Sequence, residues 1–347
     1  MRLHDQRGSI LILSLWALML LASFTVSLGY GVRQKAALFD RLDTLNTLYP
    51  AAYSGIDAAR GLMKVEDQTP TMDTLMDDWA QNKALFKEVK TGNRGYFTVS
   101  AQLSNSTEKS PAIRYGLTDE QSKININTSD AGTLTRILQI AGDLDPQSAE
   151  EIAYNIIDWR DSDSTFEHPN YGAEDDYYNH LQAPYAAKNA PFEVIDELLL
   201  VKGINRALFD KMKEFLTPFG SGATNINTAA KEVILALGVN EPLANKIMNY
   251  RKGADREDHT GDDRFFKESG NIANELNSVD ALDQPEKALL ENLVSMGKLG
   301  VLSSQFMVKC RGVLNKNGAT VESEAVIDRK GKVFYVRESN VQWPAKA

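Results

Sequence analysis

Apolar residues form one unbroken block near the start of the chain and become periodic further along. No charged side chain lies between Ser9 and Val32, and about 20 apolar residues suffice for a helix to cross a bilayer. The block therefore predicts one membrane-spanning helix. A buried core helix is the alternative interpretation, but such a helix at the end of a chain usually carries a polar stripe.

The helix is expected to continue beyond the apolar block, from Gln34 to about Glu66. Pro50 should kink or interrupt it, because proline lacks the backbone N–H that a helical hydrogen bond needs. Four leucines recur at steps of three or four residues and predict one buried face: Leu38, Leu42, Leu45 and Leu48.

Alternating apolar and polar residues predict β-strands in two separate parts of the chain. The first part holds the candidate strands 95–103 and 112–117. The second part holds residues 306–314, 319–328 and 333–337, joined by hairpin turns at Asn315–Gly318 and Arg329–Gly331. We therefore expect a small antiparallel sheet that packs against the long helix and is divided in sequence by an insertion.

The insertion runs from about Ser122 to Leu302, is helical by pattern and contains a repeat. An Asn-Ile-Asn-Thr sequence occurs twice, at 125–128 and 225–228. Its Asn-Thr pair is expected to cap the helix that follows, and a glycine to end that helix. The expected helices are 131–141 and 147–159 in the first copy and 229–237 and 241–251 in the second; residues 191–215 form a third unit and residues 277–293 a fourth.

The paired helices resemble helix-hairpin-helix or SAM-like modules. Where such modules bind DNA, they use backbone amides at the hairpin glycine, and Val201–Ile204 around Gly203 is the best match in this chain. The alternative is that the hairpin only packs helices together. The acidic surroundings favour packing, because no basic stripe accompanies the glycine.

Acidic side chains crowd the segment between the first and third units. Residues 158–178 hold seven carboxylates and one arginine, and crowded carboxylates repel one another unless they are solvated, protonated or neutralised by a cation. Oxygen ligands on a flexible loop suit Ca²⁺, although the spacing from Asp161 and Asp163 to Glu174 does not fit an EF-hand. A solvated acidic loop is the alternative. His168 is a weaker zinc candidate, because no cysteine or second histidine at ligand spacing accompanies it.

Composition narrows the classes of function. The 347 residues allow two or three domains, and the charged and hydrophobic fractions of 24% and 43% are those of a folded protein. A net charge of −9 argues against nucleic acid as the main partner.

Cys310 is the only cysteine, so the chain has no intrachain disulfide from which to infer its compartment. No hydrolase pattern such as Gly-x-Ser-x-Gly is present, and we predict no catalytic residue and no enzymatic activity.

The residues before the apolar block resemble the leader of type IV pilins and pseudopilins. A short charged segment ends at Gly8, and the apolar block begins at once, without the cleavage site that follows the apolar core of a secretory signal peptide. The resemblance implies cleavage between Gly8 and Ser9 by a prepilin peptidase, and N-methylation of Ser9.

One departure from the pilin pattern has a consequence for assembly. Pilin-like subunits usually carry glutamate at the fifth residue after the cut, and here that residue is Leu13. In the family this carboxylate meets the N-terminal amine of a neighbouring subunit inside the apolar filament, where an unpaired charge is costly. A subunit that lacks the carboxylate is suited to the tip of the filament.

Beside the leader and Leu13, the chain carries four further motifs: Ile124–Asn127, Asp158–Asp163, Gly172–Asp175 and Pro191–Gly203. Together these features resemble the minor pseudopilin K family of type II secretion systems. The resemblance implies an α+β fold, with a pilin-like long N-terminal transmembrane helix packed on a small antiparallel sheet and a large all-α insertion of helix-hairpin-helix/SAM-like units. It also implies structural Ca²⁺ in the insertion. Arg160, where the family more often has an apolar residue, is expected to pair with a neighbouring acid. The implied calcium ligands are Asp158, Asp161, Asp163, Glu174, Asp175 and Asp176.

The resemblance also implies a division of the chain, a location and a function. The parts are a leader (1–8), a transmembrane helix (9–32), a pilin-like helical spine with the first strands (33–121), an inserted α-helical domain (122–302) and the remaining strands (303–347). The protein would cross the bacterial inner membrane once, with its C-terminal part in the periplasm. It would start and cap the tip of the pseudopilus that drives export of folded proteins across the outer membrane.

The expected partners are the minor pseudopilins I and J, through them minor pseudopilin H and the major pseudopilin, and the prepilin peptidase. Secretin or exoprotein cargo are further expected contacts, and nucleic acid is not. The alternative function is a pilin-like competence protein that binds DNA through helix-hairpin-helix units, which predicts salt-sensitive DNA binding.

Overall fold

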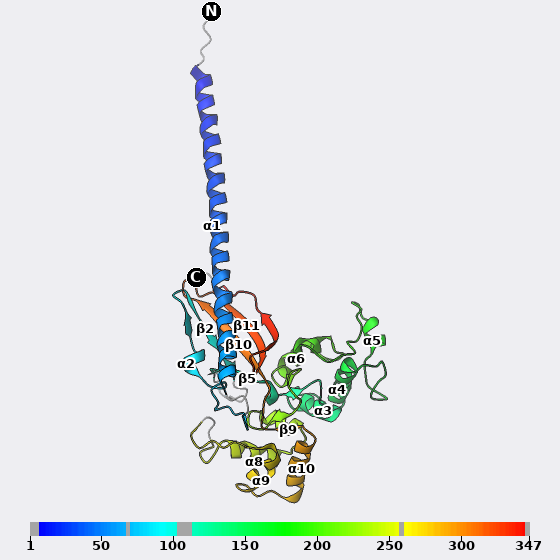
Figure 1. Ribbon diagram of the computed structural model, residues 1–347. Coiled ribbons are helices and arrows are strands. Elements are labelled where there is room, and N and C mark those ends of the chain that lie inside the picture. Colours follow the sequence, from blue (N-terminus) through cyan, green and yellow to red (C-terminus); the bar gives the residue numbers. More distant parts are fainter. Residues whose placement is uncertain (1–6, 67–69, 103–112, 257–259, 344–347) are drawn as a thin grey trace, which may run out of the picture.

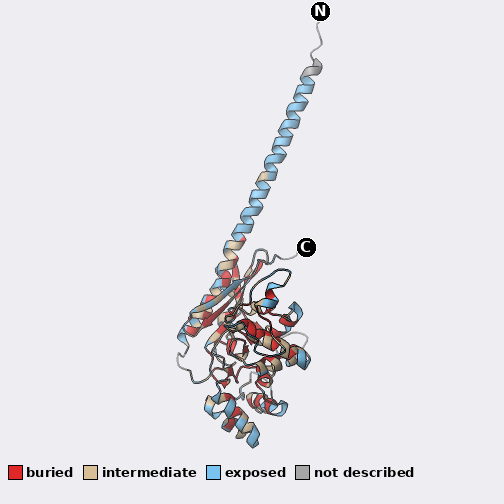
Figure 2. Cartoon of the chain, turned by 90° about the vertical axis from the view of Figure 1, so that its right-hand side faces the viewer, coloured by how far each residue is buried: buried red, intermediate tan, exposed pale blue. Residues whose placement is uncertain are grey.

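One helix, α1 (Arg7–Val65), dominates the computed structural model, which describes residues 7–66, 70–102, 113–256 and 260–343. Its first half projects away from the folded part of the chain (Figure 1), and no residue from Ile10 to Asp43 is buried (Figure 2). Among the described residues, Ile10–Val65 is the one helix that is long and apolar enough to cross a membrane. An apolar surface of this size, left uncovered, requires a non-aqueous or protein environment.

Two details of α1 differ from the sequence prediction. Pro50 lies inside the helix and does not interrupt it; Pro50 and Asn46, whose carbonyl loses its helical partner, are both exposed, so water can satisfy that carbonyl. Leu38 and Leu42 are exposed in the single chain, and only Leu48 of the four predicted leucines is fully buried. The buried face of α1 therefore begins about one turn before Leu48.

An antiparallel sheet of six strands packs against the second half of α1, and its strand order is β1-β2-β10-β11-β12, with β5 paired to β10. The three longest strands come from the C-terminal part of the chain, and the predicted hairpin turns join them, with Gly318 and Gly331 at positive φ. The predicted residues Leu103 and Ala112 lie outside the described ranges. The strand bounds are β1 (Val89–Thr91), β2 (Gly95–Val99), β5 (Thr118–Asp119), β10 (Gln305–Leu314), β11 (Thr320–Asp328) and β12 (Val333–Glu338); α2 (Lys83–Phe86) and the pair β3 (Ala101–Gln102) and β4 (Ile113–Arg114) lie beside the sheet in sequence.

Two glycines let α1 approach the sheet closely. A Cβ at Gly55 would lie 2.2 Å from the Sγ atom of buried Cys310, and one at Gly312 would lie 3.0 Å from the backbone of Leu48. The contact buries one side of the helix against strands β2 and β10. Leu48, Ala52, Ile56, Ala59 and Met63 face this core.

The insertion between β5 and β10 forms a second hydrophobic core from two consecutive repeats. Each repeat begins and ends in a two-residue parallel pair, β6 with β7 and β8 with β9, so the insertion is not purely α-helical as predicted. In Figure 1 the first repeat lies to the right of the sheet and the second below it. The elements are η1 (Glu120–Ser122), then β6 (Ile124–Asn125), α3 (Ala131–Ile140), α4 (Pro146–Arg160), α5 (Asp175–Asn179), η2 (Ile195–Leu200), α6 (Arg206–Met212) and β7 (Leu216–Thr217), followed by β8 (Thr224–Asn225), α7 (Lys231–Ala236), α8 (Glu241–Arg251), η3 (Ser269–Asn271), α9 (Ile272–Asn277), α10 (Gln284–Ser295) and β9 (Leu299–Gly300).

The repeated asparagines tie each repeat together instead of capping its first helix. The side chain of Asn127 donates to the carbonyl of Phe192 at 2.9 Å and accepts from the Phe192 N–H at 2.8 Å. Asn227 makes the same pair of bonds to Phe266, at 2.9 and 2.8 Å. Asp130 caps α3. A buried amide that satisfies both backbone groups of a distant residue fixes the return of the chain in each repeat.

A buried polar network joins the insertion to the sheet. Asp119, at the end of β5, accepts hydrogen bonds from the hydroxyls of Thr228 and Ser303 and from the side-chain amide of Asn225. Burial raises the pKa of Asp119 to about 6, against the opposing effect of these donors. Arg329 of the β11–β12 turn pairs with buried Asp73 in the same region.

Gly55→Ala should destabilise the protein, because the added methyl group collides with Cys310 at the helix–sheet contact. Overpacking of this kind costs about 1–3 kcal/mol. The matched control is Gly61→Ala on the same helix, where a Cβ meets nothing within 4 Å and helix propensity favours alanine by about 1 kcal/mol. Urea unfolding of both variants in detergent measures the difference; equal stability would contradict the close contact.

Asp119→Asn should flatten the dependence of stability on pH between about pH 4 and pH 6. The folded protein keeps the Asp119 proton up to a pKa of about 6 and the unfolded chain releases it near 3.8, so the stability of the wild type falls as pH rises through this window. Ionisation of Asp119 accounts for a loss of up to about 3 kcal/mol in the free energy of unfolding across this window. Urea unfolding over a pH series measures it, with exposed Asp57→Asn as control; an unchanged pH profile would be contrary to this account.

Candidate metal centre

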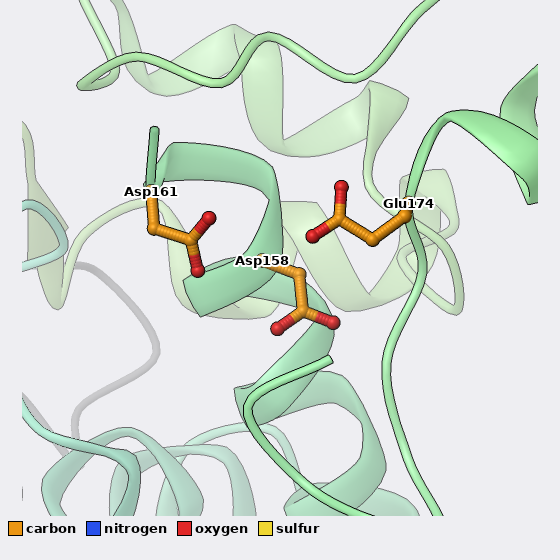
Figure 3. A group of neighbouring side chains, drawn as sticks. All are labelled: Asp158, Asp161 and Glu174. Carbon is orange, nitrogen blue, oxygen red and sulfur yellow. The ribbon is translucent and has the colours of Figure 1, made fainter. Parts of the chain in front are cut away.

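Three carboxylates meet at the outer end of the first repeat (Figure 3). Asp158 lies in the last turn of α4, Asp161 directly follows that helix, and Glu174 directly precedes α5. Each offers an oxygen atom within 4.8 Å of the others, and Asp158 and Glu174 are buried. Residues that are distant in sequence are therefore brought to one point by the loop between α4 and α5.

Asp158 organises this loop. Its two carboxylate oxygens accept the backbone N–H groups of Glu167, at 3.2 Å, and Ala173, at 3.1 Å. Gly172 lies directly over it at a φ of +138°, and a Cβ there would be 2.3 Å from the Asp158 Oδ2 atom. Only glycine therefore lets the chain cross the carboxylate so closely.

The other two carboxylates have no such partners. Both oxygens of Asp161 and both of Glu174 are buried without a hydrogen-bond partner, which is costly for a polar group and more so for a charge. Burial, followed by the neighbouring carboxylates, raises the pKa of Glu174 to about 7. Burial is also the main cause that raises the pKa of Asp158, to about 6, and that of Asp161. Protonation or a bound cation would lower the electrostatic cost of burying these carboxylates together. The three carboxylates suit a hard cation, which prefers oxygen ligands.

The other predicted ligands lie outside the group of three. One oxygen of Asp163 accepts the N–H of Thr165 at 2.8 Å, one oxygen of Asp175 accepts the N–H of Ala187 at 2.7 Å, and Asp176 is exposed. Asp163 and Asp175 are still close enough to contribute to the raised pKa of Glu174. His168 stacks on Tyr171, with ring centroids 4.7 Å apart.

Arg160 has a different role from the predicted ion pair with a neighbouring acid. Its guanidinium donates to the backbone carbonyls of Ile126 and Ser129, the latter at 2.6 Å. It therefore ties the end of α4 to the Asn-Ile-Asn segment, and its charge lowers the pKa of Asp161 only in part against the raising effect of burial.

The predicted processing and assembly residues lie at the start of α1. Gly8 and Ser9 belong to its first turn, and Leu13 follows on the same helix, with 73% of its surface exposed. The folded part of the protein therefore leaves Leu13 free to contact lipid or another chain.

The candidate DNA-binding hairpin, Val201–Ile204, packs against other parts of the chain. Gly203, at a φ of +88°, packs on Ile152, where a Cβ would lie 2.8 Å from a side-chain atom. The carbonyl of Lys202 accepts from Asn155 at 3.1 Å, and its Nζ atom pairs with Glu151 at 3.0 Å. These contacts hold the hairpin against α4.

The fold defines a class of protein: a long N-terminal helix on an antiparallel sheet, as in pilin-like proteins, with a large and mainly helical insertion. The family model for type II secretion system protein K matches residues 115–219. Protein K of Klebsiella pneumoniae is 24% identical over 99% of both chains, and that of Aeromonas hydrophila is 26% identical over 47% of this chain and 49% of its own. A chain in the crystal structure of the GspK–GspI–GspJ complex from enterotoxigenic Escherichia coli superposes with a TM-score of 0.60 at 18% identity, over 89% of this chain and 99% of that one. By these comparisons the chain is similar to protein K of type II secretion systems over nearly its whole length, and the likeness to the solved chain shows the same fold.

Proposed function

We propose that this protein is the minor pseudopilin that starts and caps the tip of the periplasmic pseudopilus of a type II secretion system. The observation that carries the proposal is the free first half of α1, which has no charged side chain from Ser9 to Val32 and ends in a folded body far wider than the helix (Figure 1). The helix suits a filament anchor, and the insertion suits a cap because its bulk would obstruct the addition of a subunit above it. Neither task needs a catalytic group.

The leader and Leu13 indicate how the subunit is anchored and which place it takes in the filament. Cleavage between Gly8 and Ser9 and methylation of Ser9 would leave the whole apolar helix on the mature protein, anchored in the inner membrane with the folded part in the periplasm. Without a carboxylate at position 13, the subunit has no counterpart for the amine of a subunit already in place. It would therefore be the first subunit of the filament.

The partners follow from the relatives. The solved complex that contains the similar chain is one of GspK with GspI and GspJ. By this similarity the protein would bind minor pseudopilins I and J, and through them minor pseudopilin H and the major pseudopilin. The prepilin peptidase would process it, and the exposed insertion is available to the secretin or to cargo.

We propose that the three carboxylates bind structural Ca²⁺. The orphaned oxygens of Asp161 and Glu174 support this. Asp163 and Asp175, whose charges act on Glu174, would join the ligand set on binding, together with backbone carbonyls. We also propose that the helix pairs of the insertion are helix-hairpin-helix or SAM-like units that serve packing alone, as the buried contacts of Gly203 indicate.

Leu13→Glu should reduce both recovery of the complex with minor pseudopilins I and J and secretion of exoprotein, because it places a charge in the apolar filament without an arranged partner. Co-purification from membranes and a secretion assay measure the two effects. Leu15→Glu controls for the general cost of a charge in this helix, and Leu13→Met for the loss of leucine. Complex formation and secretion equal to those of the wild type would disprove the role of position 13.

Calcium should raise the melting temperature of the full chain in detergent, because an ion that binds only the folded state stabilises it by about 2.7 kcal/mol at one hundred times its Kd. For a domain of the size of the insertion, this corresponds to a rise of about 5–10 °C in melting temperature. The double variant Asp161→Asn/Glu174→Gln should lose the shift, whereas Asp143→Asn, an exposed control, should keep it. A melting temperature of the wild type that does not respond to calcium would refute the calcium proposal.

A further inference from the structure

The second repeat contains a close counterpart of the helix that carries the metal ligands. Residues 152–161 at the end of α4 match residues 243–252 at the end of α8, and the buried apolar positions coincide in the two helices. Ile152, Ala153, Ile156 and Trp159 correspond to Leu243, Ala244, Ile247 and Tyr250.

The arginines that end the two helices also correspond. Arg160 donates to the carbonyl of Ser129 in the first repeat, and Arg251 donates to the carbonyl of Ala229, one hundred positions later, in the second. The two helix ends therefore lie against the two Asn-Ile-Asn segments in the same way. This shared anchoring fixes the alignment of the ligand positions independently of the hydrophobic pattern.

The alignment places different chemistry at the ligand positions. Asp158 is replaced by Asn249 and Asp161 by Lys252. Asp158 is fully buried under its loop, whereas Asn249 is exposed. A neutral amide and a cation at these two positions cannot form the acidic group that the first repeat presents.

The segments that follow the helices differ in length but end at the same anchor. In the first repeat the long loop, residues 161–191, leads to Phe192, which Asn127 holds. In the second repeat the short loop, residues 252–265, of which 257–259 lie outside the described residues, is followed by Phe266, which Asn227 holds. Closing a longer loop costs more entropy, so the long loop has the greater need of an additional tie to the helix.

We propose that Asn249 and Lys252 confine the ion to the first repeat, and that the ion serves to hold the long loop on α4. This inference rests on the proposed calcium binding and goes beyond it by assigning the ion one task in one repeat. None of the three carboxylates belongs to the second repeat, the sheet or α1, so these parts should keep their structure without the ion. Loss of calcium would then release the outermost part of the insertion and leave the assembly helix unchanged.

Hydrogen exchange measured by mass spectrometry tests this on the full chain in detergent, with calcium and with a chelator. Calcium at one hundred times its Kd should slow exchange in the long loop by about 100-fold and leave the short loop, the sheet and α1 unchanged. Equal slowing in both loops would overturn the inference while calcium binding itself stands. No change anywhere would overturn both.

Placing the lysine of the second repeat at the matching position of the first tests, without calcium, whether the ion holds the long loop. Asp161→Lys should abolish the calcium response, and its long loop should exchange more slowly than that of the ion-free wild type, because one orphaned carboxylate is removed and the lysine can pair with Glu174. Asp161→Asn is the milder variant if the lysine prevents folding, and Asp143→Lys is the control for the change of charge. Faster exchange of the long loop in the ion-free variants would overturn the inference.

Discussion

The close contact between α1 and strand β10 determines how the rest of the molecule can work. Gly55 on the helix and Gly312 on the strand remove the side chains that would hold the two elements apart. Because α1 continues without a break through Pro50 into the exposed apolar half, this contact also fixes the direction of the anchor relative to the folded body. A force applied along the helix is therefore transmitted directly to the sheet and the insertion.

Features with a local physical cause could be predicted from the sequence. The apolar block, the hairpins at Gly318 and Gly331 and most helices of the insertion follow from composition, turn chemistry and periodicity over a few residues. The apolar face at Leu38 and Leu42 was also visible, but no residue in the described part of the chain covers it, so both leucines are exposed. Periodicity shows that a face is apolar and does not say what covers it.

Contacts between distant residues could not be predicted in this way. The sequence showed seven acids in the segment 158–178, and only the return of the loop over Gly172 brings Asp158, Asp161 and Glu174 together. The asparagines of the two repeats matched helix caps by pattern, yet their side chains bind Phe192 and Phe266. The first copy of the duplicated framework carries this acidic group, whereas the positions that match Asp158 and Asp161 in the second copy are Asn249 and Lys252.

The mass of the protein extracted from membranes, with and without a prepilin peptidase, tests the central claim most directly. A pilin-type subunit loses residues 1–8 and gains one methyl group on Ser9 only when the peptidase is present, and this is the result that we expect. An uncut chain in both samples would make α1 an ordinary membrane anchor and would contradict the assignment of this protein to a pseudopilus.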